Sequence, residues 1–277
     1  MSSILGNLLG NSIFNTNNLT TSSILGNTIG NSIFSTNNLT TMENNMKETG
    51  SYCSNSLDES NAAPRCPVSL LLDVSGSMSG EPINELNQGL HQFISETSSD
   101  ETASMSVELE IITFDSKASV LMPFTPIYEI EHMPAPLSAN GSTCMGAALR
   151  MANEDLRNRR IMYRQAGISS YKPWVILMTD GEPNDDWQAA AMEMRELGER
   201  GKIQFIGIEL GSGANHSTLC QILPSNPGPL KLKGLRFKQF FRWLTDSLRS
   251  VSLCDVSYEK QIDFTDEVTS WAELAGM

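Results

Sequence analysis

Two short apolar runs in this chain each end at an aspartate. Residues 68–72 lead into Asp73, and residues 172–179 lead into Asp180. A continuous apolar run bounded by small polar residues and glycine is typical of a parallel strand that is buried on both faces. Parallel strands of an open α/β sheet end at one edge, and ligands bind there at the point where the strand order reverses. If these two strands are neighbours at that point, both carboxylates face one crevice.

The loops after these strands add hydroxyl groups. Ser75 and Ser77 stand second and fourth after Asp73, on a predicted strand-to-helix loop. Thr143, just ahead of a predicted helix, can bring a third loop to the same crevice. Mg²⁺ takes oxygen ligands in near-octahedral geometry and keeps some of its water. The sequence therefore predicts a site for Mg²⁺ (or Mn²⁺) that consists of Asp73, Ser75, Ser77, Thr143 and Asp180.

The chain between residues 66 and 255 alternates predicted strands with amphipathic helices. The stretch 106–114 begins with alternating polar and apolar residues, then becomes apolar, and forms a predicted edge hairpin with 118–122. Asp185 or Asp186 is expected to cap the helix that follows Asp180. The other predicted elements are strands near 202–210 and 230–232 and helices near 82–96, 143–156, 216–222 and 237–251. This order predicts a doubly wound, mostly parallel, Rossmann-like α/β sheet with one antiparallel edge strand and helices on both faces.

The ends of the chain differ from this domain. Residues 2–21 and 22–41 are a tandem repeat with three differences and no charged residue, and their Asn and Ser content predicts disorder. We interpret 1–41 as this repeat, 42–65 as a linker, 66–255 as the domain and 256–277 as an acidic C-terminal tail. One hypothesis is that translation of the functional protein starts at Met42 or Met46. The competing hypothesis makes the repeat an adhesive or targeting arm.

Composition restricts the partners and the compartment. The net charge of −13 argues against binding to nucleic acid or to an anionic membrane surface. No apolar run is long enough to span a membrane, and the first residues lack the basic charge of a signal peptide. The five cysteines are odd in number and include no CxxC pair, as is typical of small apolar side chains in a reducing compartment. These features predict a cytoplasmic protein.

The loop at residues 73–77, taken together with Thr143 and Asp180, resembles the metal-ion-dependent adhesion site of von Willebrand factor type A domains. In that family the two serines and the threonine typically coordinate the ion directly, and the carboxylates act directly or through water. The resemblance assigns these roles to the five residues named above and leaves open which carboxylate binds directly. It also implies that a protein partner supplies a Glu or Asp carboxylate to the ion. We place Gly76, Met78, Ser142 and Glu182 at the partner-binding rim.

Further segments look like the bacterial tellurium-resistance group of such proteins, the TerY-like set. They are residues 73–82, 112–115, 146–149, 177–183 and 240–244, and the similarity covers roughly residues 66–254. The resemblance implies a cytoplasmic, single-domain protein in a stress, metal or phage response. Relatives of this kind are commonly encoded beside a kinase-like and a phosphatase-like protein, which are therefore candidate partners.

A hydrolase or phosphatase that uses the same metal is the alternative function. Such a site needs a nucleophile or activated water and a base within reach, and no histidine lies near the three loops in sequence. Glu182 could be that base or a solvated rim carboxylate. The loop Gly76–Gly80 has methionine where the G-x-S-x-G elbow has serine. We therefore predict that the protein is not an enzyme.

Two other features have simple explanations. Gly211-Ser212-Gly213 lacks the Lys and the hydroxyl residue of a nucleotide-binding P-loop. Cys144 could be a redox sensor next to Thr143, but burial at the start of a helix is the ordinary explanation and the one we prefer.

Overall fold

One seven-stranded sheet organises the part of the chain that the computed structural model describes, residues 57–211, 215–257 and 268–274. The strand order is β3-β2-β1-β4-β5-β6-β7, and the five central strands are parallel. The predicted mostly parallel α/β fold is confirmed. The strands are β1 (Cys66–Asp73), β2 (Val107–Phe114), β3 (Ala118–Pro126), β4 (Trp174–Thr179), β5 (Gln204–Glu209), β6 (Pro229–Leu232) and β7 (Ala272–Leu274). The tandem repeat and the two candidate start methionines lie outside the described residues.

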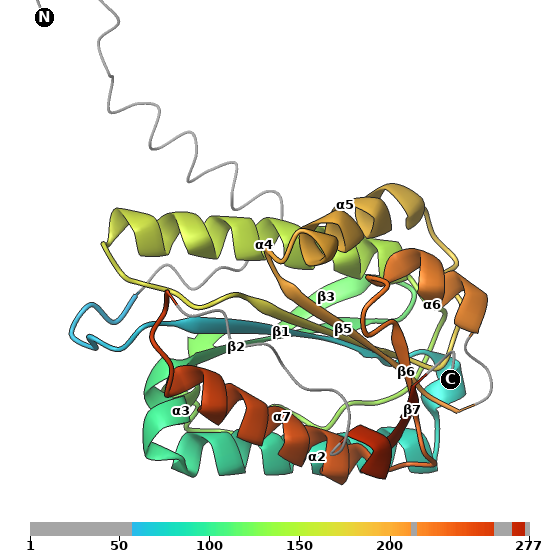
Figure 1. Ribbon diagram of the computed structural model, residues 1–277. Coiled ribbons are helices and arrows are strands. Elements are labelled where there is room, and N and C mark those ends of the chain that lie inside the picture. Colours follow the sequence, from blue (N-terminus) through green and yellow to red (C-terminus); the bar gives the residue numbers. More distant parts are fainter. Residues whose placement is uncertain (1–56, 212–214, 258–267, 275–277) are drawn as a thin grey trace, which may run out of the picture. The chain divides into compact units, whose positions relative to one another are not determined.

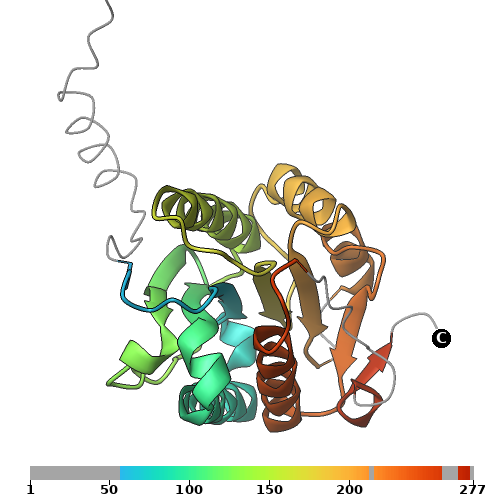
Figure 2. The same cartoon turned by 60° about the vertical axis from the view of Figure 1, so that its left-hand side comes forward.

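Helices cover both faces of the sheet, as predicted (Figures 1 and 2). One face carries α4 (Met145–Gln165), α5 (Gln188–Glu199) and α6 (His216–Ile222). The other carries α2 (Glu81–Ser99), α3 (Glu101–Ser106) and α7 (Phe237–Ser252). Successive side chains of a strand point to opposite faces. Leu70 and Leu72 of β1 therefore pack with α2 and α7, whereas Leu71 packs with α4. This double burial explains why the strand is apolar along most of its length.

The order of the strands reverses between β1 and β4. From β1 the chain passes to β2 on one side, and the later strands β4, β5 and β6 are added on the other side. The crossovers leaving β1 and β4 therefore go to opposite faces of the sheet, through α2 and α5 respectively (Figure 1). A crevice opens between the carboxyl ends of two such strands. Asp73 ends β1, and Asp180 follows β4 directly.

The folded region begins earlier than the predicted linker allows. The Arg65 guanidinium donates to the carbonyl oxygens of Asp58 and Asn61, at 2.7 and 2.9 Å. The Asn61 amide donates to the Met105 carbonyl at 2.8 Å, and the Tyr128 hydroxyl donates to Asp58 at 2.6 Å. Residues 58–65, predicted as linker, are thus attached to the domain. The contacts of Asn61 and Asp58 with the rest of the domain are polar and distant in sequence, so no local apolar pattern marks this segment.

The predicted acidic tail is corrected at its end. Residues 268–274 form a turn, η3 (Val268–Ser270), and then β7, which pairs antiparallel with β6. The sheet therefore has a second antiparallel edge strand besides β3. Trp271 is only 1% exposed, and its ring centroid lies 5.2 Å from that of Phe240 and 5.3 Å from that of Trp243. A three-residue strand is too short to show a sequence period.

Replacing Trp271 with alanine tests whether this end belongs to the fold. We expect Trp271→Ala to lower the free energy of unfolding by about 3 kcal/mol, because it empties a fully packed aromatic site. Glu273→Ala, at an exposed position of β7 two residues after Trp271, is the control and should change stability little. Urea denaturation measures both. Equal, small effects of the two substitutions would contradict the structure.

A buried charged network lies on the α4 face of β2, near the start of that strand. Glu108 accepts from Arg159 Nε at 2.6 Å and pairs with Arg65 Nε at 3.2 Å. Two residues on, Glu110 accepts from the Ser69 hydroxyl at 2.5 Å and lies near Asp155 of α4. The alternating polar residues in 106–114 therefore lie on a buried polar face of the strand and not on a solvated one. Burial and the neighbouring Asp155 charge raise the pKa of Glu110 well above the ordinary 4.5.

Glu110→Gln should make the protein more stable at alkaline pH. A raised folded-state pKa means that wild-type stability falls as the pH rises from 4.5 through that pKa. Glutamine keeps the acceptor for Ser69 and needs no proton beside Asp155. We expect the variant to match wild type near pH 4 and to exceed it at pH 8 in urea denaturation. Glu129→Gln, at an exposed position, should not change the pH dependence. Loss of stability in Glu110→Gln at pH 8 would refute this account.

Candidate functional site

Asp73 lies at the base of the crevice. Its side chain is fully buried, and its two oxygens accept hydrogen bonds from different segments. Oδ1 accepts from the Ser75 amide at 2.8 Å, and Oδ2 accepts from the Thr179 hydroxyl of β4 at 2.5 Å. Burial raises the pKa of Asp73, the hydrogen bonds from Ser75 and Thr179 lower it, and the nearby charge of Asp180 raises it further. The two hydrogen bonds therefore hold the carboxylate in position, and burial makes its ionised form costly in free energy.

A chain of hydroxyl contacts joins the first loop to the loop after β4. The Ser75 and Ser77 hydroxyl oxygens are 3.0 Å apart, and the Ser77 hydroxyl donates to Asp180 Oδ1 at 2.7 Å. Ser75 is buried, whereas Ser77 is exposed. The oxygens thus extend from the base of the crevice to the surface.

Thr143 reaches the crevice from a third loop. That loop is attached to the first one by hydrogen bonds from Asn140 N to Val74 O at 2.8 Å and from Gly76 N to Gly141 O at 3.1 Å. Gly181 shows how close the loops are. A Cβ added there would lie 3.2 Å from Thr143 Oγ1 and 3.8 Å from Asp73 Oδ2. All five side chains predicted as metal ligands therefore lie in three loops that meet at the ends of β1 and β4.

The predicted rim is corrected at one residue. Gly76 and Glu182 are exposed, and Ser142 is half-buried. Met78 is 0% exposed, because the short helix η1 (Gly76–Met78) turns its side chain into the core beneath the loop. It therefore cannot contact a partner. Glu182 accepts from the Asn215 side chain at the start of α6, a contact that sequence spacing does not indicate.

The sequence model of the von Willebrand factor type A domain matches residues 68–235. This match spans more than half of the chain and includes all five residues of the candidate site. The chain belongs to the von Willebrand factor type A family. A comparison of the sequence with curated proteins finds no match.

Several solved structures are similar to this chain. Proximal thread matrix protein 1 from the mussel byssus matches with a TM-score of 0.50 and 18% identity, over 69% of this chain and 47% of its own. The ArnB paralog VWA2 from Sulfolobus acidocaldarius matches with a TM-score of 0.45 and 16% identity, over 67% and 45%. Manganese-loaded TRAP protein from Plasmodium vivax matches with a TM-score of 0.43 and 23% identity, over 62% and 69%. The chain spans about half the length of the first of these structures.

Within this von Willebrand factor type A domain, Asp185 has a different role from the predicted one. It caps α4 rather than α5: Oδ1 accepts from Gly146 N at 2.8 Å and Oδ2 accepts from Ala147 N at 2.7 Å. At the start of α5, Trp187 is the N-cap and makes no side-chain capping bond. A Cβ added at Gly146 would lie 2.5 Å from the Trp187 Cα, so glycine allows this close approach. The loop after β4 thereby holds the helix that follows Thr143.

Cys144 is the N-cap residue of α4, and its thiol is half-buried. Desolvation raises its pKa, and the negative charges of Asp185 and Asp115 raise it further. A raised pKa opposes the thiolate form that a redox sensor needs. This favours the simpler explanation of Cys144 as a partly buried thiol in the helix start.

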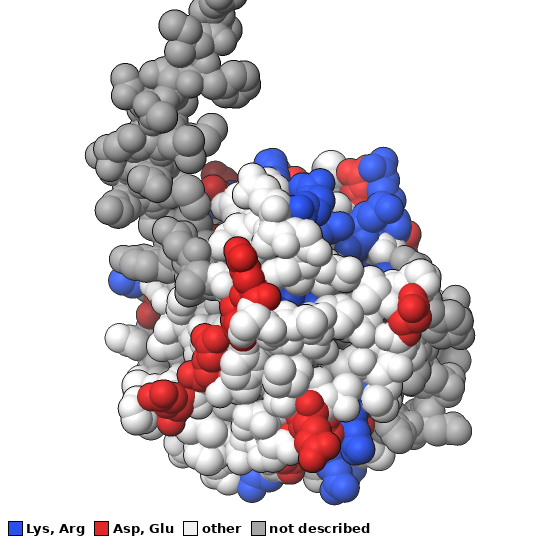
Figure 3. All heavy atoms as spheres, turned by 90° about the vertical axis from the view of Figure 1, so that its left-hand side faces the viewer, with Lys and Arg blue, Asp and Glu red and all other residues white. Residues whose placement is uncertain are grey.

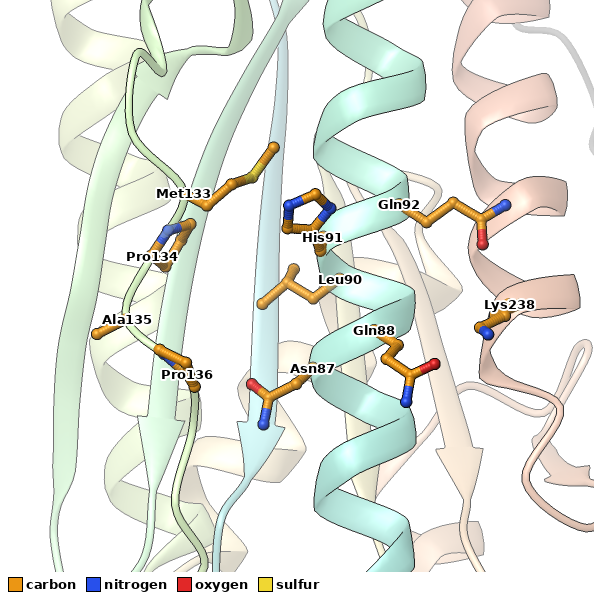
Figure 4. A pocket seen from close by; sticks show the side chains of 10 residues that line it. All are labelled: Asn87, Gln88, Leu90, His91, Gln92, Met133, Pro134, Ala135, Pro136 and Lys238. Atoms are coloured by element: carbon orange, nitrogen blue, oxygen red, sulfur yellow. The ribbon is translucent and has the colours of Figure 1, made fainter.

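Among the pockets of the described residues, the two of greater volume lie away from the five site residues. One of about 460 Å³ runs along α2 beside the segment 133–136 (Figure 4). Its lining residues are Asn87, Gln88, Leu90, His91, Gln92, Met133, Pro134, Ala135, Pro136 and Lys238. The other, of about 340 Å³, lies between α4 and α5 and includes Arg157, Arg160 and Arg164. Figure 3 views the domain from the edge where β1 begins, and basic side chains gather there over α4 and α5.

In residues 57–211, 215–257 and 268–274, no helix is both long and apolar enough to cross a lipid bilayer. No group of three or more His, Cys, Asp or Glu side chains in them is arranged to hold a metal ion. The candidate site has two carboxylates and three hydroxyls, so it is a site of a different composition.

Asp185→Ala should destabilise the domain through the start of α4. We expect a loss of about 1–2 kcal/mol in the free energy of unfolding, because two helix N–H groups lose their acceptor. Asp186→Ala is the matched control, since Asp186 is exposed and its backbone carbonyl, not its side chain, accepts from Arg150. Thermal and urea denaturation measure both. A larger effect at Asp186 would contradict the assignment of the cap.

Proposed function

We propose that the chain binds Mg²⁺ (or Mn²⁺) through Asp73, Ser75, Ser77, Thr143 and Asp180. The main support is an electrostatic one. The ion pairs of the described residues include neither Asp73 nor Asp180, although the two carboxylates lie close enough for the charge of Asp180 to raise the pKa of Asp73. Their contacts are instead with hydroxyls and an amide. Two acidic groups surrounded by neutral oxygen donors fit a hard divalent cation.

The residues around the donors hold them in place. Thr179 and the Ser75 amide orient Asp73, and the chain of hydroxyls from Ser75 through Ser77 orients Asp180. Serine and threonine hydroxyls can rotate to present a lone pair, so these residues can serve as neutral donors. Neutral donors leave a bound cation strongly electrophilic, and the cation then supplies a binding position for an acidic side chain.

We propose that this acidic side chain, a Glu or Asp, belongs to a partner protein. The exposed positions of Gly76, Ser77 and Glu182 give a partner access to the edge of the crevice. With a net charge of −13, the chain repels an acidic group in the absence of a bridging cation. The protein is then a metal-dependent interaction module. The alternative, a hydrolase or phosphatase at the same site, is tested by phosphatase assays with Mg²⁺ and Mn²⁺.

Titration with Mg²⁺ and Mn²⁺ tests the metal site. We expect one saturable site per chain in isothermal titration calorimetry, and an increase in melting temperature when the ion is present at a large excess over its dissociation constant. Asp180→Asn should weaken binding at least about tenfold, since it removes one charge while keeping an oxygen for Ser77. Asp186→Asn, an exposed neighbour, is the matched control. Equal metal affinity in both variants would refute the assignment.

The partner is tested with immobilised protein in native lysate. Wild type should retain an acidic partner with Mg²⁺ and lose it with EDTA, and Asp180→Asn should not retain it in either condition. A partner that binds equally in all four conditions would contradict metal-bridged binding. The kinase-like and phosphatase-like operon neighbours, the stress or tellurite response and the cytoplasmic location rest on the sequence alone and stay predictions.

A further inference from the structure

Cys220, His216 and Glu209 form a cluster at the end of β5, outside the five-residue metal site. His216 and Cys220 are four residues apart in α6 and therefore share one face of the helix. Cys220 Sγ lies 3.4 Å from His216 Nε2, and His216 Nδ1 lies 2.8 Å from Glu209 Oε2. The thiol is exposed, whereas the Glu209 side chain is only 4% exposed. A thiol, an imidazole and a buried carboxylate thus stand in line.

The contacts of Glu209 determine which imidazole nitrogen carries the proton. Its Oε1 pairs with Lys231 Nζ at 3.4 Å, across the pairing of β5 with β6. An ionised carboxylate can only accept hydrogen bonds, so His216 Nδ1 donates to it. In the neutral ring Nε2 then has a free lone pair, and this atom faces the Cys220 thiol. The order of nucleophile, base and orienting carboxylate is that of an activated nucleophile.

Charged side chains from two further elements surround the cluster. Arg195 of α5 donates to the Cys220 carbonyl oxygen at 2.8 Å, and Arg195 itself pairs with Glu199 at 3.6 Å. Lys231 stands on the far side of Glu209. The Glu209 carboxylate contacts Nδ1 of the imidazole, while Nε2 faces the thiol, so Glu209 holds the ring in position against Cys220.

The other cysteines that the structure describes lack this environment. Burial raises the pKa of Cys66 to about 12, and desolvation raises that of Cys144. The Cys254 thiol is half-buried and donates to the Ser250 carbonyl at 3.3 Å. Cys220 is the exposed cysteine of this set and the one that has an imidazole partner.

We propose that Cys220 is a nucleophilic thiol that forms mixed disulfides with small-molecule disulfides. His216 Nε2 accepts the thiol proton, and the Cys220 sulfur attacks one sulfur of the disulfide. A bond forms between these two sulfurs while the original S–S bond breaks. The leaving sulfur departs as a thiolate and takes the proton from His216, so atoms and charge balance. Glu209 is a positioning residue that acts through His216.

Glutathione disulfide is the probe, and site-resolved mass spectrometry of the full chain is the readout. We expect Cys220 to gain glutathione at pH 7 faster than Cys66, Cys144 or Cys254, and a thiol reductant to remove it. Cys220→Ser should abolish this adduct while the calorimetric Mg²⁺ titration stays unchanged, so the outcome is independent of the proposed metal function. Faster modification of Cys144 or Cys254 than of Cys220 would overturn the proposal.

Substitutions of His216 and Glu209 test whether the imidazole and its carboxylate partner activate the Cys220 thiol. His216→Asn should slow modification of Cys220 on the order of tenfold or more at pH 7. His91→Asn, at an exposed histidine of α2, is the matched control and should leave the rate unchanged. Glu209→Gln should slow the reaction less, and both variants should show a steeper rise in rate from pH 6 to pH 8 than wild type. An unchanged rate and pH profile in His216→Asn with native circular dichroism would refute the role of the imidazole.

Discussion

The hydrogen bonding of one buried carboxylate determines much of the geometry of this domain's crevice. Taking an ionised carboxylate out of water is costly unless its oxygens find partners. Asp73 finds two, the Ser75 amide in its own loop and the Thr179 hydroxyl on the neighbouring strand. Each bond stabilises the charge and also fixes a piece of backbone. The two hydrogen bonds of Asp73 therefore connect the loop after β1 with β4. This connection brings Ser77 within hydrogen-bond distance of Asp180.

The third loop is held by the backbone rather than by the candidate ligands. The Cys144 amide donates to the Asp115 carbonyl at 2.7 Å, just after β2, and the Asn184 amide donates to the Thr143 carbonyl at 3.0 Å. Asp185 then accepts from the first turn of α4. The segment after β4 thus supplies Asp180 and also holds the loop of Thr143. A change in this one segment affects two of the five side chains at once.

Local patterns predicted the parts of the site that depend on local structure. The two apolar runs located β1 and β4, and the positions after them located four of the five side chains, since residues at a strand end lie at one edge of the sheet. The failures involve distant contacts. Asp185 precedes one helix and caps another, and Trp271 packs on α7 from beyond the predicted domain. Met78 turns inward between the exposed residues Ser77 and Ser79, and local spacing does not distinguish its direction from theirs.

Buried carboxylates at the two ends of the central strands have different kinds of partner. Near the start of β2, Glu108 is buried with Arg65 and Arg159, so the positive charge comes from within the chain. At the far end, Asp73 is equally buried and receives only neutral donors, with a second carboxylate nearby. In the described residues, two arginines pair with Glu108 and no ion pair includes Asp73, although Arg150 and Lys231 pair with other acids at the carboxyl end of the sheet. Asp73 and Asp180 thus have no ion-pair partner within the described residues, and an external cation is the counter-charge that we propose for them.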